Sequence, residues 1–154
     1  MVEFGYNEDQ VLQPAQAAIL QDIRPCNKRP QRVVHDNLTP NVILRGIVSN
    51  ACCQNAQYNV RYSGNIAVPE GGTVGQIQLA LSVGGYNRPF TIAAATPAAA
   101  TEYWHVSGDA TIDVPVGCCT TVAVVNASVS PTPGTTPAPT LTLRNLNVTV
   151  SRLA

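Results

Sequence analysis

Apolar and polar side chains alternate along several short stretches of the chain, and turn-forming residues separate these stretches. Alternation with a period of two residues is typical of a β-strand that has one buried face. It is clear in "YNVRYSGNIAVP", which begins at Tyr58, and in "GQIQLALSV", which begins at Gly75. The Gly84–Gly85 pair that follows accepts positive φ and predicts a hairpin turn. The apolar positions of the two strands are Tyr58, Val60, Tyr62, Ile66, Val68, Ile77, Leu79, Leu81 and Val83.

The same pattern predicts strands through most of the remaining chain. In "RPFTIAAAT", Phe90 and Ile92 lie in the same phase, which predicts a strand that returns beside the previous one. A bulge or corner at Ser107–Gly108 is expected to separate two short strands, "EYWHV" and "ATIDV". Further strands are expected in "RVVHDN" (an edge strand), "NVILRGIVSN" and "CCTTVAVVNASV".

The last strand, "LTLRNLNVTVSRLA", changes its apolar phase between Arg144 and Asn145. A change of phase within one strand predicts a β-bulge. The proline-rich segment 130–140 before it predicts an extended, solvated loop. About eight to ten strands at these turn spacings predict an all-β fold, an antiparallel jelly-roll sandwich over residues 31–154. Residues 1–30 are expected to form an arm and a basic, proline-broken loop, with a first strand over 15–22.

The composition narrows the classes of function. Charged residues make up 12% of the chain, about half of the usual share, and aromatic residues make up 5%. A surface with so few charges is expected to be covered in part by other subunits. Nine basic and nine acidic residues cancel, which gives no electrostatic argument for nucleic acid or an anionic membrane. The start "MVEFGYNEDQ" lacks the features of a signal peptide, so synthesis in the cytoplasm is expected.

The five cysteines are Cys26, Cys52, Cys53, Cys118 and Cys119. An odd number argues against a closed disulfide framework. Adjacent residues of a strand point to opposite faces, so a Cys-Cys pair does not easily chelate one ion, and no metal site is expected. Buried thiols are the favoured interpretation, and a cross-strand or intersubunit disulfide is the alternative.

No catalytic constellation is evident, so an enzyme is not expected, nor is a cofactor. His35 and His105 each stand apart from a nucleophile, and His35 and its neighbour Asp36 point to opposite faces of a strand. The segment "GGTVG" lacks the following lysine and helix of a phosphate loop and is expected to be a turn. The aromatic residues Tyr103 and Trp104, together with Tyr58 and Tyr62, suit either a sugar-binding shelf or, more simply, a core or interface.

The order of the segments "NVILRGIVSN", "YNVRYSGNIAVPEGGTVGQIQLALSVGGYNRPF", "VPVGCCTTVAVVNAS" and "NVTVSRLA" resembles that of small phage and prophage virion proteins of Firmicutes. It is also similar to the tumour-necrosis-factor-like jelly roll at the tip of the collagen-like exosporium glycoproteins of spores. The resemblance covers Ile43 to Ala154 and depends on turn placement and strand order. The proline- and threonine-rich insertion at 130–140 departs from the pattern.

The resemblance implies a homotrimer that decorates or cements the head of a virion, assembled in the bacterial cytoplasm. Its partners would be sister copies and the major capsid protein or another virion protein. A receptor- or carbohydrate-binding tip of a fibre or surface appendage, with a host-surface glycan as ligand, is the alternative. The residues expected at the trimer interface are Tyr58, Val60, Tyr62, Trp104, Leu146, Val148 and Val150. Those expected to anchor the chain to the capsid are Phe4, Tyr6, Lys28, Arg29 and Arg32.

Overall fold

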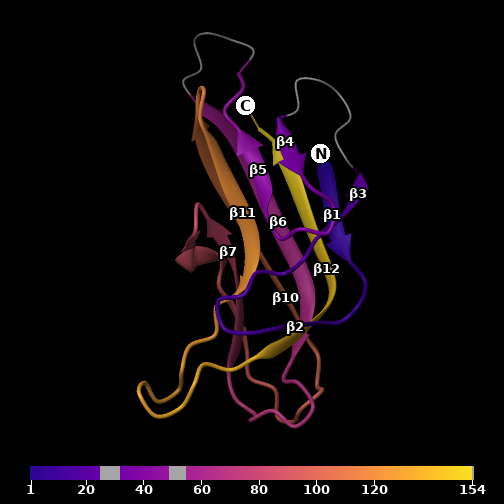
Figure 1. Cartoon of the computed structure of the whole chain (residues 1–154), viewed down its shortest axis with the longest axis vertical. Helices are drawn as coiled ribbons and strands as arrows, with labels where there is room; N and C mark the ends of the chain where they lie inside the picture. The colour runs from indigo at the N-terminus through magenta and orange to yellow at the C-terminus, as the bar shows by residue number, and fades with distance from the viewer. Residues whose placement is uncertain (25–31, 49–54, 154) are drawn as a thin grey trace.

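Two antiparallel β-sheets face each other in the computed structural model, which describes residues 1–24, 32–48 and 55–153 (Figure 1). Sheet A runs in the order β10 (Trp104–Pro115), β6 (Asn55–Ala67), β12 (Leu141–Arg152), β1 (Val2–Tyr6) and β3 (Gln21–Arg24), and β2 (Gln10–Leu12) also pairs with β12. Sheet B runs in the order β4 (Val33–His35), β5 (Val42–Arg45), β11 (Cys119–Asn126), β7 (Ile77–Val83) and β8 (Tyr86–Asn87), and β9 (Ala93–Ala95) also pairs with β7. A single turn of 3₁₀ helix, η1 (Pro89–Thr91), lies between β8 and β9.

From β5 onward the chain passes repeatedly from one sheet to the other. β5, β7 and β11 lie in sheet B, whereas β6, β10 and β12 lie in sheet A. This antiparallel, sheet-switching arrangement confirms the predicted jelly-roll sandwich. Among the described residues, no helix is long and apolar enough to cross a membrane.

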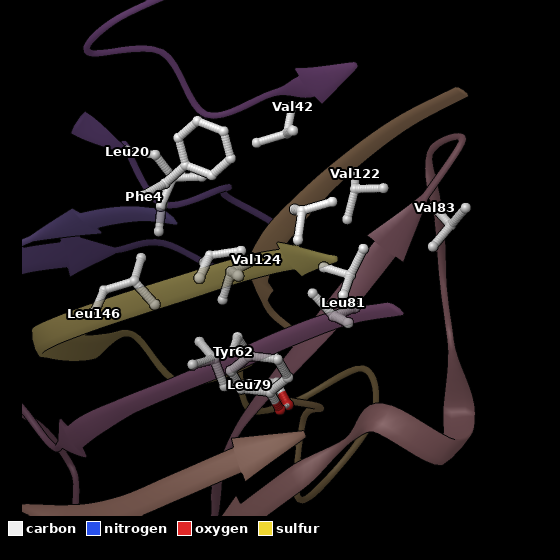
Figure 2. Packing of buried hydrophobic residues seen from close by; sticks show 14 of the residues in the cluster. Phe4, Leu20, Val42, Tyr62, Leu79, Leu81, Val83, Val122, Val124 and Leu146 are labelled. Atoms are coloured by element: carbon white, nitrogen blue, oxygen red, sulfur yellow. Dashed lines mark hydrogen bonds between the residues drawn. The ribbon is translucent and has the colours of Figure 1, made fainter. Parts of the chain in front are cut away.

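The core lies between the sheets, and the alternation of the sequence explains its composition. The apolar faces predicted for β6 and β7 are both buried, with Val83 the most exposed member at 7%. Figure 2 shows Tyr62 of sheet A beside Leu79 and Leu81 of sheet B. Each fully buried side chain of this kind contributes about 1.5–3 kcal/mol of hydrophobic stabilisation relative to an exposed one.

Two tyrosines of β6 also connect the sheets by hydrogen bonds. The Tyr58 hydroxyl donates to the carbonyl of Arg45 in β5, at 2.5 Å. The Tyr62 hydroxyl lies 2.6 Å from the carbonyl of Thr91 and 3.0 Å from that of Leu79. Burial raises the pKa of Tyr62, so its proton remains available for donation. A phenol whose hydroxyl finds a backbone acceptor in the opposite sheet is both a core residue and a polar link.

The phase change in the last strand is a β-bulge, as predicted. The pairing of β12 with β6 shifts register between Arg144 and Asn147, and Asn145 takes a positive φ of 54°. Asparagine tolerates this backbone region better than most residues. Because the bulge restores the phase, Leu143 and Leu146 are both buried although they stand three positions apart.

The segment after the Gly84–Gly85 turn differs from its prediction. Both glycines have positive φ, and the hairpin from β7 to β8 is confirmed. The chain returns as expected, but later: β9 (Ala93–Ala95) pairs antiparallel with β7, whereas residues 89–91 form η1 and Phe90, expected in a strand, is 101% exposed. The buried residue is Thr91, because Pro89 initiates a helical turn and the period of two no longer applies.

The expected break at Ser107–Gly108 is also wrong. β10 is continuous and pairs with β6 without a shift of register. Gly108 is required here for space, because a Cβ atom would lie 2.7 Å from the Tyr62 ring and 2.7 Å from the Thr91 carbonyl oxygen. The glycine marks a close approach to a large core side chain, which is the other common reason for a glycine in a strand.

The N-terminal residues form a strand in place of the expected arm. β1 lies between β12 and β3, and its residues pair in register from Val2↔Val150 to Tyr6↔Leu146. Residues 15–20 are not the first strand; they make isolated bridges, Ala17↔Val125 and Leu20↔Thr39, before β3 begins. The aromatic residues near the N-terminus therefore complete the fold, because β1 has a neighbouring strand on each side.

Candidate binding surface

The residues predicted at a trimer interface lie mostly inside one chain. Six of them, Tyr58, Val60, Tyr62, Leu146, Val148 and Val150, are at most 2% exposed. Their side chains face sheet B, so they have no surface to offer a second copy, and this assignment is corrected. The alternation identified the buried face, but that face packs against the opposite sheet of the same chain. Only Trp104, at 45% exposed, remains accessible.

The residues predicted to anchor the chain to a capsid are not on a free arm either. Phe4 is 1% exposed and packs against the His35 ring, with the ring centroids 4.8 Å apart. Tyr6 is half-buried in β1, which joins a strand on each side. Arg32 is half-buried, and its carbonyl accepts a hydrogen bond from the Arg45 amide. Lys28 and Arg29 lie outside the described residues.

The histidines and cysteines do not assemble a reactive centre in the described part of the chain. His35 Nδ1 lies 2.5 Å from Asp22 Oδ1, and His35 Nε2 lies 2.9 Å from the Thr39 carbonyl oxygen. Both ring nitrogens are thus engaged, and the ring links β4 to β3, the edge strands of the two sheets. Within residues 1–24, 32–48 and 55–153 there is no group of three or more His, Cys, Asp or Glu side chains that would hold a metal.

Cys118 and Cys119 are free and exposed, so the buried-thiol interpretation is wrong for this pair. The reason is their position at the start of β11, directly after the turn at Gly117, whereas the buried part of the strand begins at Val122. Cys26, Cys52 and Cys53 lie outside the described residues.

The outer face of sheet A carries an organised polar cluster at one end. Arg144 donates two hydrogen bonds to Asp9, from Nε to Oδ1 at 2.7 Å and from Nη2 to Oδ2 at 2.8 Å. Its guanidinium carbon also lies 4.1 Å from the centroid of the Tyr103 ring, and the Tyr103 hydroxyl donates to Asp9 at 3.4 Å. A bidentate pair that also stacks on an aromatic ring fixes all three side chains.

This cluster continues across neighbouring strands. Arg144 of β12 stands opposite Asn65 of β6, which in turn stands opposite His105 of β10. The His105 Nδ1 and Asn65 Oδ1 atoms are 3.2 Å apart. Trp104 precedes His105 and stands opposite Ile66, so it lies on the other face of the sheet at the same end, where its indole donates to Glu102 Oε1 at 3.1 Å. We call the residues Asp9, Asn65, Tyr103, Trp104, His105 and Arg144 the rim cluster.

The electrostatics of the rim cluster are set by the Asp9–Arg144 pair. Hydrogen bonds from Arg144 lower the pKa of Asp9, and hydrogen bonding to Asp9 raises the pKa of Arg144. Partial burial, followed by the negative charge of Asp9, raises the pKa of Tyr103. The pair is therefore ionised and self-neutralised around neutral pH.

The sequence suggested only part of this site. Tyr103 and Trp104 were candidates for a sugar-binding shelf, and both lie in the rim cluster, whereas Tyr58 and Tyr62 lie in the core. Asp9 and Arg144 were missed as a pair, because they are 135 positions apart and no local pattern connects them. The pairing of β2 with β12, in which Gln10 stands opposite Leu143, brings the two together.

A second feature is an apolar cleft of about 390 Å³ at the end of the sandwich where the chain leaves β6. One wall is the turn segment 68–76 and the other is the segment 129–140, which includes the predicted proline-rich loop. Both segments lie in the lower part of Figure 1. No charged side chain lines the cleft; its apolar lining includes Val68, Pro69, Val74, Val129, Pro137 and Pro139.

Comparisons with known proteins give no family for the chain, since no family model and no curated protein matches it. Among solved structures it is similar to the EclA C-terminal domain, described as a sugar-binding protein, with 13% identity over 94% of this chain and 79% of that one and a TM-score of 0.43. It is also similar to CBM35 from Cellvibrio japonicus Abf62, with 17% identity, coverage of 96% and 99%, and a TM-score of 0.29. Both TM-scores are below 0.5, so the description of the fold depends on the strand pairing of the chain itself.

Proposed function

We propose that this protein is a non-catalytic binding module that recognises a neutral glycan through the rim cluster. Ligand sites commonly combine an aromatic surface with a few polar groups held in fixed positions. At one end of sheet A the rim cluster offers the amide of Asn65, the imidazole of His105 and the donors of Arg144 on the outer face, and the exposed indole of Trp104 on the opposite face of the edge strand β10. Sugar hydroxyls need both donors and acceptors, and a sugar's C–H face packs well on an aromatic ring.

The observation that carries this proposal is the fixed Asp9–Arg144–Tyr103 arrangement on an exposed surface. Arg144 and Asp9 side chains are each 44% exposed, so part of each remains available to a ligand. Their mutual hydrogen bonds and the stacking on Tyr103 reduce the entropy lost when a ligand binds. Because the pair neutralises itself, an uncharged oligosaccharide is favoured over an acidic one.

An array of neutral and acidic oligosaccharides, followed by calorimetric titration of the best ligand, tests this function. We expect a neutral ligand to bind, and Trp104→Ala and Arg144→Ala each to weaken binding by at least about tenfold, which corresponds to 1.4 kcal/mol. Tyr86→Ala is the matched control for the tryptophan, since Tyr86 is an exposed aromatic residue of sheet B. Absence of any glycan ligand, or equal affinity of all these proteins, contradicts the proposal.

A multi-copy structural role is the second candidate, and the fully exposed Phe90 favours it. Aromatic residues are enriched at surfaces that bind other proteins. The homotrimer and the placement on a virion head or an appendage stay predictions of the sequence resemblance. Antibody labelling of particles viewed by electron microscopy tests the placement: many labelled positions over the head support decoration, and a few at an appendage support a tip. Unlabelled particles contradict both.

A further inference from the structure

Phe90 is an apolar side chain that the fold holds in solvent. It is 101% exposed, although the residue after it, Thr91, is 2% exposed. Thr91 Oγ1 accepts a hydrogen bond from the Leu81 amide at 3.0 Å and donates to the Arg88 carbonyl at 2.7 Å. The Thr91 carbonyl in turn accepts from the buried Tyr62 hydroxyl. η1 is therefore tied to the core, and its outward side chain is not simply part of a loose loop.

A rigidly presented aromatic side chain has the properties of a binding anchor. Phenylalanine removes about 150–250 Å² from water when it becomes buried. Its attachment to an ordered turn lowers the conformational entropy lost on docking. Pro89 at the first position of η1 further restricts the backbone beside it.

The apolar cleft between segments 68–76 and 129–140 is large enough to receive this ring. Its volume of about 390 Å³ exceeds that of a protein cavity of about 150 Å³ that binds benzene. Its walls are valines, prolines, glycines and uncharged polar residues, which suit a side chain without charge. Phe90 of the same chain does not occupy it, because Phe90 is fully exposed.

The charges that flank the two features are complementary. Arg88 is exposed two positions before Phe90, and Glu70 is exposed beside Pro69 at the rim of the cleft. The positions of the two features also differ. The cleft segments lie in the lower part of Figure 1, whereas η1 follows the hairpin at the far end of β7. An anchor and a recess on separate parts of one surface match between copies in a head-to-tail manner.

We propose that Phe90 of one copy docks into the cleft of a second copy, with Arg88 facing Glu70. The contact is heterologous: it joins different surfaces of the two copies. Repetition of such a contact gives a closed ring of subunits when the rotation between copies brings the last copy back to the first, and an open filament when it does not. The Phe90 side chain and the cleft alone bury less surface than a standard protein–protein interface, which begins at about 1,200 Å². Each contact is accordingly weak by itself, and closure of a ring strengthens assembly through its effective concentration.

Sedimentation velocity across a range of protein concentrations, without any glycan, tests the interface independently of the proposed function. We expect wild-type chain to associate as concentration rises, and Phe90→Ser and Val74→Arg each to remain monomeric. Both substitutions are at exposed positions, Val74 being 44% exposed, so folding is expected to be preserved. Val116→Ser is the control, and it should associate like wild type because Val116 is 51% exposed and lies outside both η1 and the cleft.

Mixing the two variants distinguishes head-to-tail docking from a symmetric contact. Phe90→Ser retains an intact cleft and Val74→Arg retains an intact anchor, so an equimolar mixture should form dimers that cannot extend. A symmetric contact between two Phe90 surfaces would let Val74→Arg associate by itself and leave Phe90→Ser out of the mixed species, and either result would overturn the proposal. Association of Phe90→Ser alone, or a wild-type chain that stays monomeric up to millimolar concentration, would overturn it as well.

The charge pair provides a second test. Arg88→Glu and Glu70→Arg should each weaken association, and the double variant should recover most of it, because the ion pair is re-formed with its signs exchanged. Photo-crosslinking from a benzoylphenylalanine at position 90 should label peptides from 68–76 or 129–140. Labels confined to other segments contradict the assignment of the cleft as the receiving site.

Discussion

Tyr62 and Phe90 are both adjacent to Thr91, Tyr62 through a hydrogen bond and Phe90 along the chain, yet one is buried and the other exposed. Tyr62 is fully buried and donates its hydroxyl proton toward the carbonyl of Thr91, and Phe90 precedes Thr91 and is fully exposed. Both are aromatic residues in segments whose sequence predicts an inward strand position. The difference lies in the backbone: β6 keeps a regular period of two, whereas η1 replaces the strand period by a helical turn.

The contrast shows that the hydrogen bonds of the buried Thr91 determine the outward direction of Phe90. The hydrogen bonds of Thr91 satisfy buried backbone groups, and this requirement outweighs the burial of a neighbouring phenyl ring. The exposure of Phe90 is thus a consequence of the hydrogen bonds of Thr91, and the proposed docking between copies would cover the exposed ring.

Replacement of Tyr62 by alanine is expected to have the largest effect. The loss of a fully buried aromatic side chain costs about 3–5 kcal/mol of the free energy of unfolding. Tyr62→Phe removes only the hydroxyl and should cost about 1–3 kcal/mol, since it leaves buried carbonyls without their donor. Urea unfolding midpoints measure both. Phe90→Ala is the control and should stay within about 0.5 kcal/mol of wild type; equal effects at both positions would remove the contrast.

Gly108→Ala is expected to have the second largest effect on the free energy of unfolding, because its new methyl group would press against the Tyr62 ring. The new Cβ atom would lie 2.7 Å from both the Tyr62 ring and the Thr91 carbonyl oxygen. Overpacking of this kind typically costs about 1–3 kcal/mol. Gly75→Ala is the matched control, since no atom lies within 4 Å of the position its Cβ would take. Similar unfolding midpoints for the two variants would show that β10 moves away freely.

These positions also show how far the sequence predicts the molecule. Alternation located β6 and β7 and their buried faces, and the phase change located the bulge of β12, because both effects are local properties of a strand. The role of Gly108 was not predicted, since it depends on how closely β10 approaches the Tyr62 ring and the Thr91 carbonyl of η1. The N-terminal strand was missed for a similar reason, because β1 pairs with β12, which lies at the other end of the chain.

The candidate site was less predictable than the fold. A buried face and an intersubunit face have the same apolar alternation, so the sequence assigned Val148 to a trimer interface although it faces sheet B. Conversely, Asp9 and Arg144 are ordinary charged residues until the pairing of strands at both ends of the chain places them 2.7 Å apart. Functional groups contributed by distant segments carry no local signature.

A smaller effect is expected for Thr91→Val, at the residue that connects the buried Tyr62 with the exposed Phe90. The substitution keeps the shape but removes the acceptor of the Leu81 amide, at a cost of about 1 kcal/mol in the free energy of unfolding. Self-association should fall more than stability does, because η1 is no longer fixed. Unfolding midpoints and sedimentation velocity report the two quantities separately. Unchanged association in Thr91→Val would show that docking does not require a rigid η1.

The smallest effect on stability is expected in the rim cluster, where the Asp9–Arg144 ion pair, and not burial, holds the Tyr103 side chain in place. Asp9 has its pKa lowered by Arg144, so the pair stabilises the fold above the ordinary pKa of a carboxyl, near 3.8, and this contribution is lost as the pH falls through the lowered value. Asp9→Asn should therefore lower the Tm slightly at pH 6, less so in high salt, and the difference should vanish in strong acid. Asp113→Asn, at the other end of β10, is the control. A Tm difference that persists unchanged in acid and in salt would mean that stacking of Arg144 on Tyr103, not the ion pair, holds the rim cluster together.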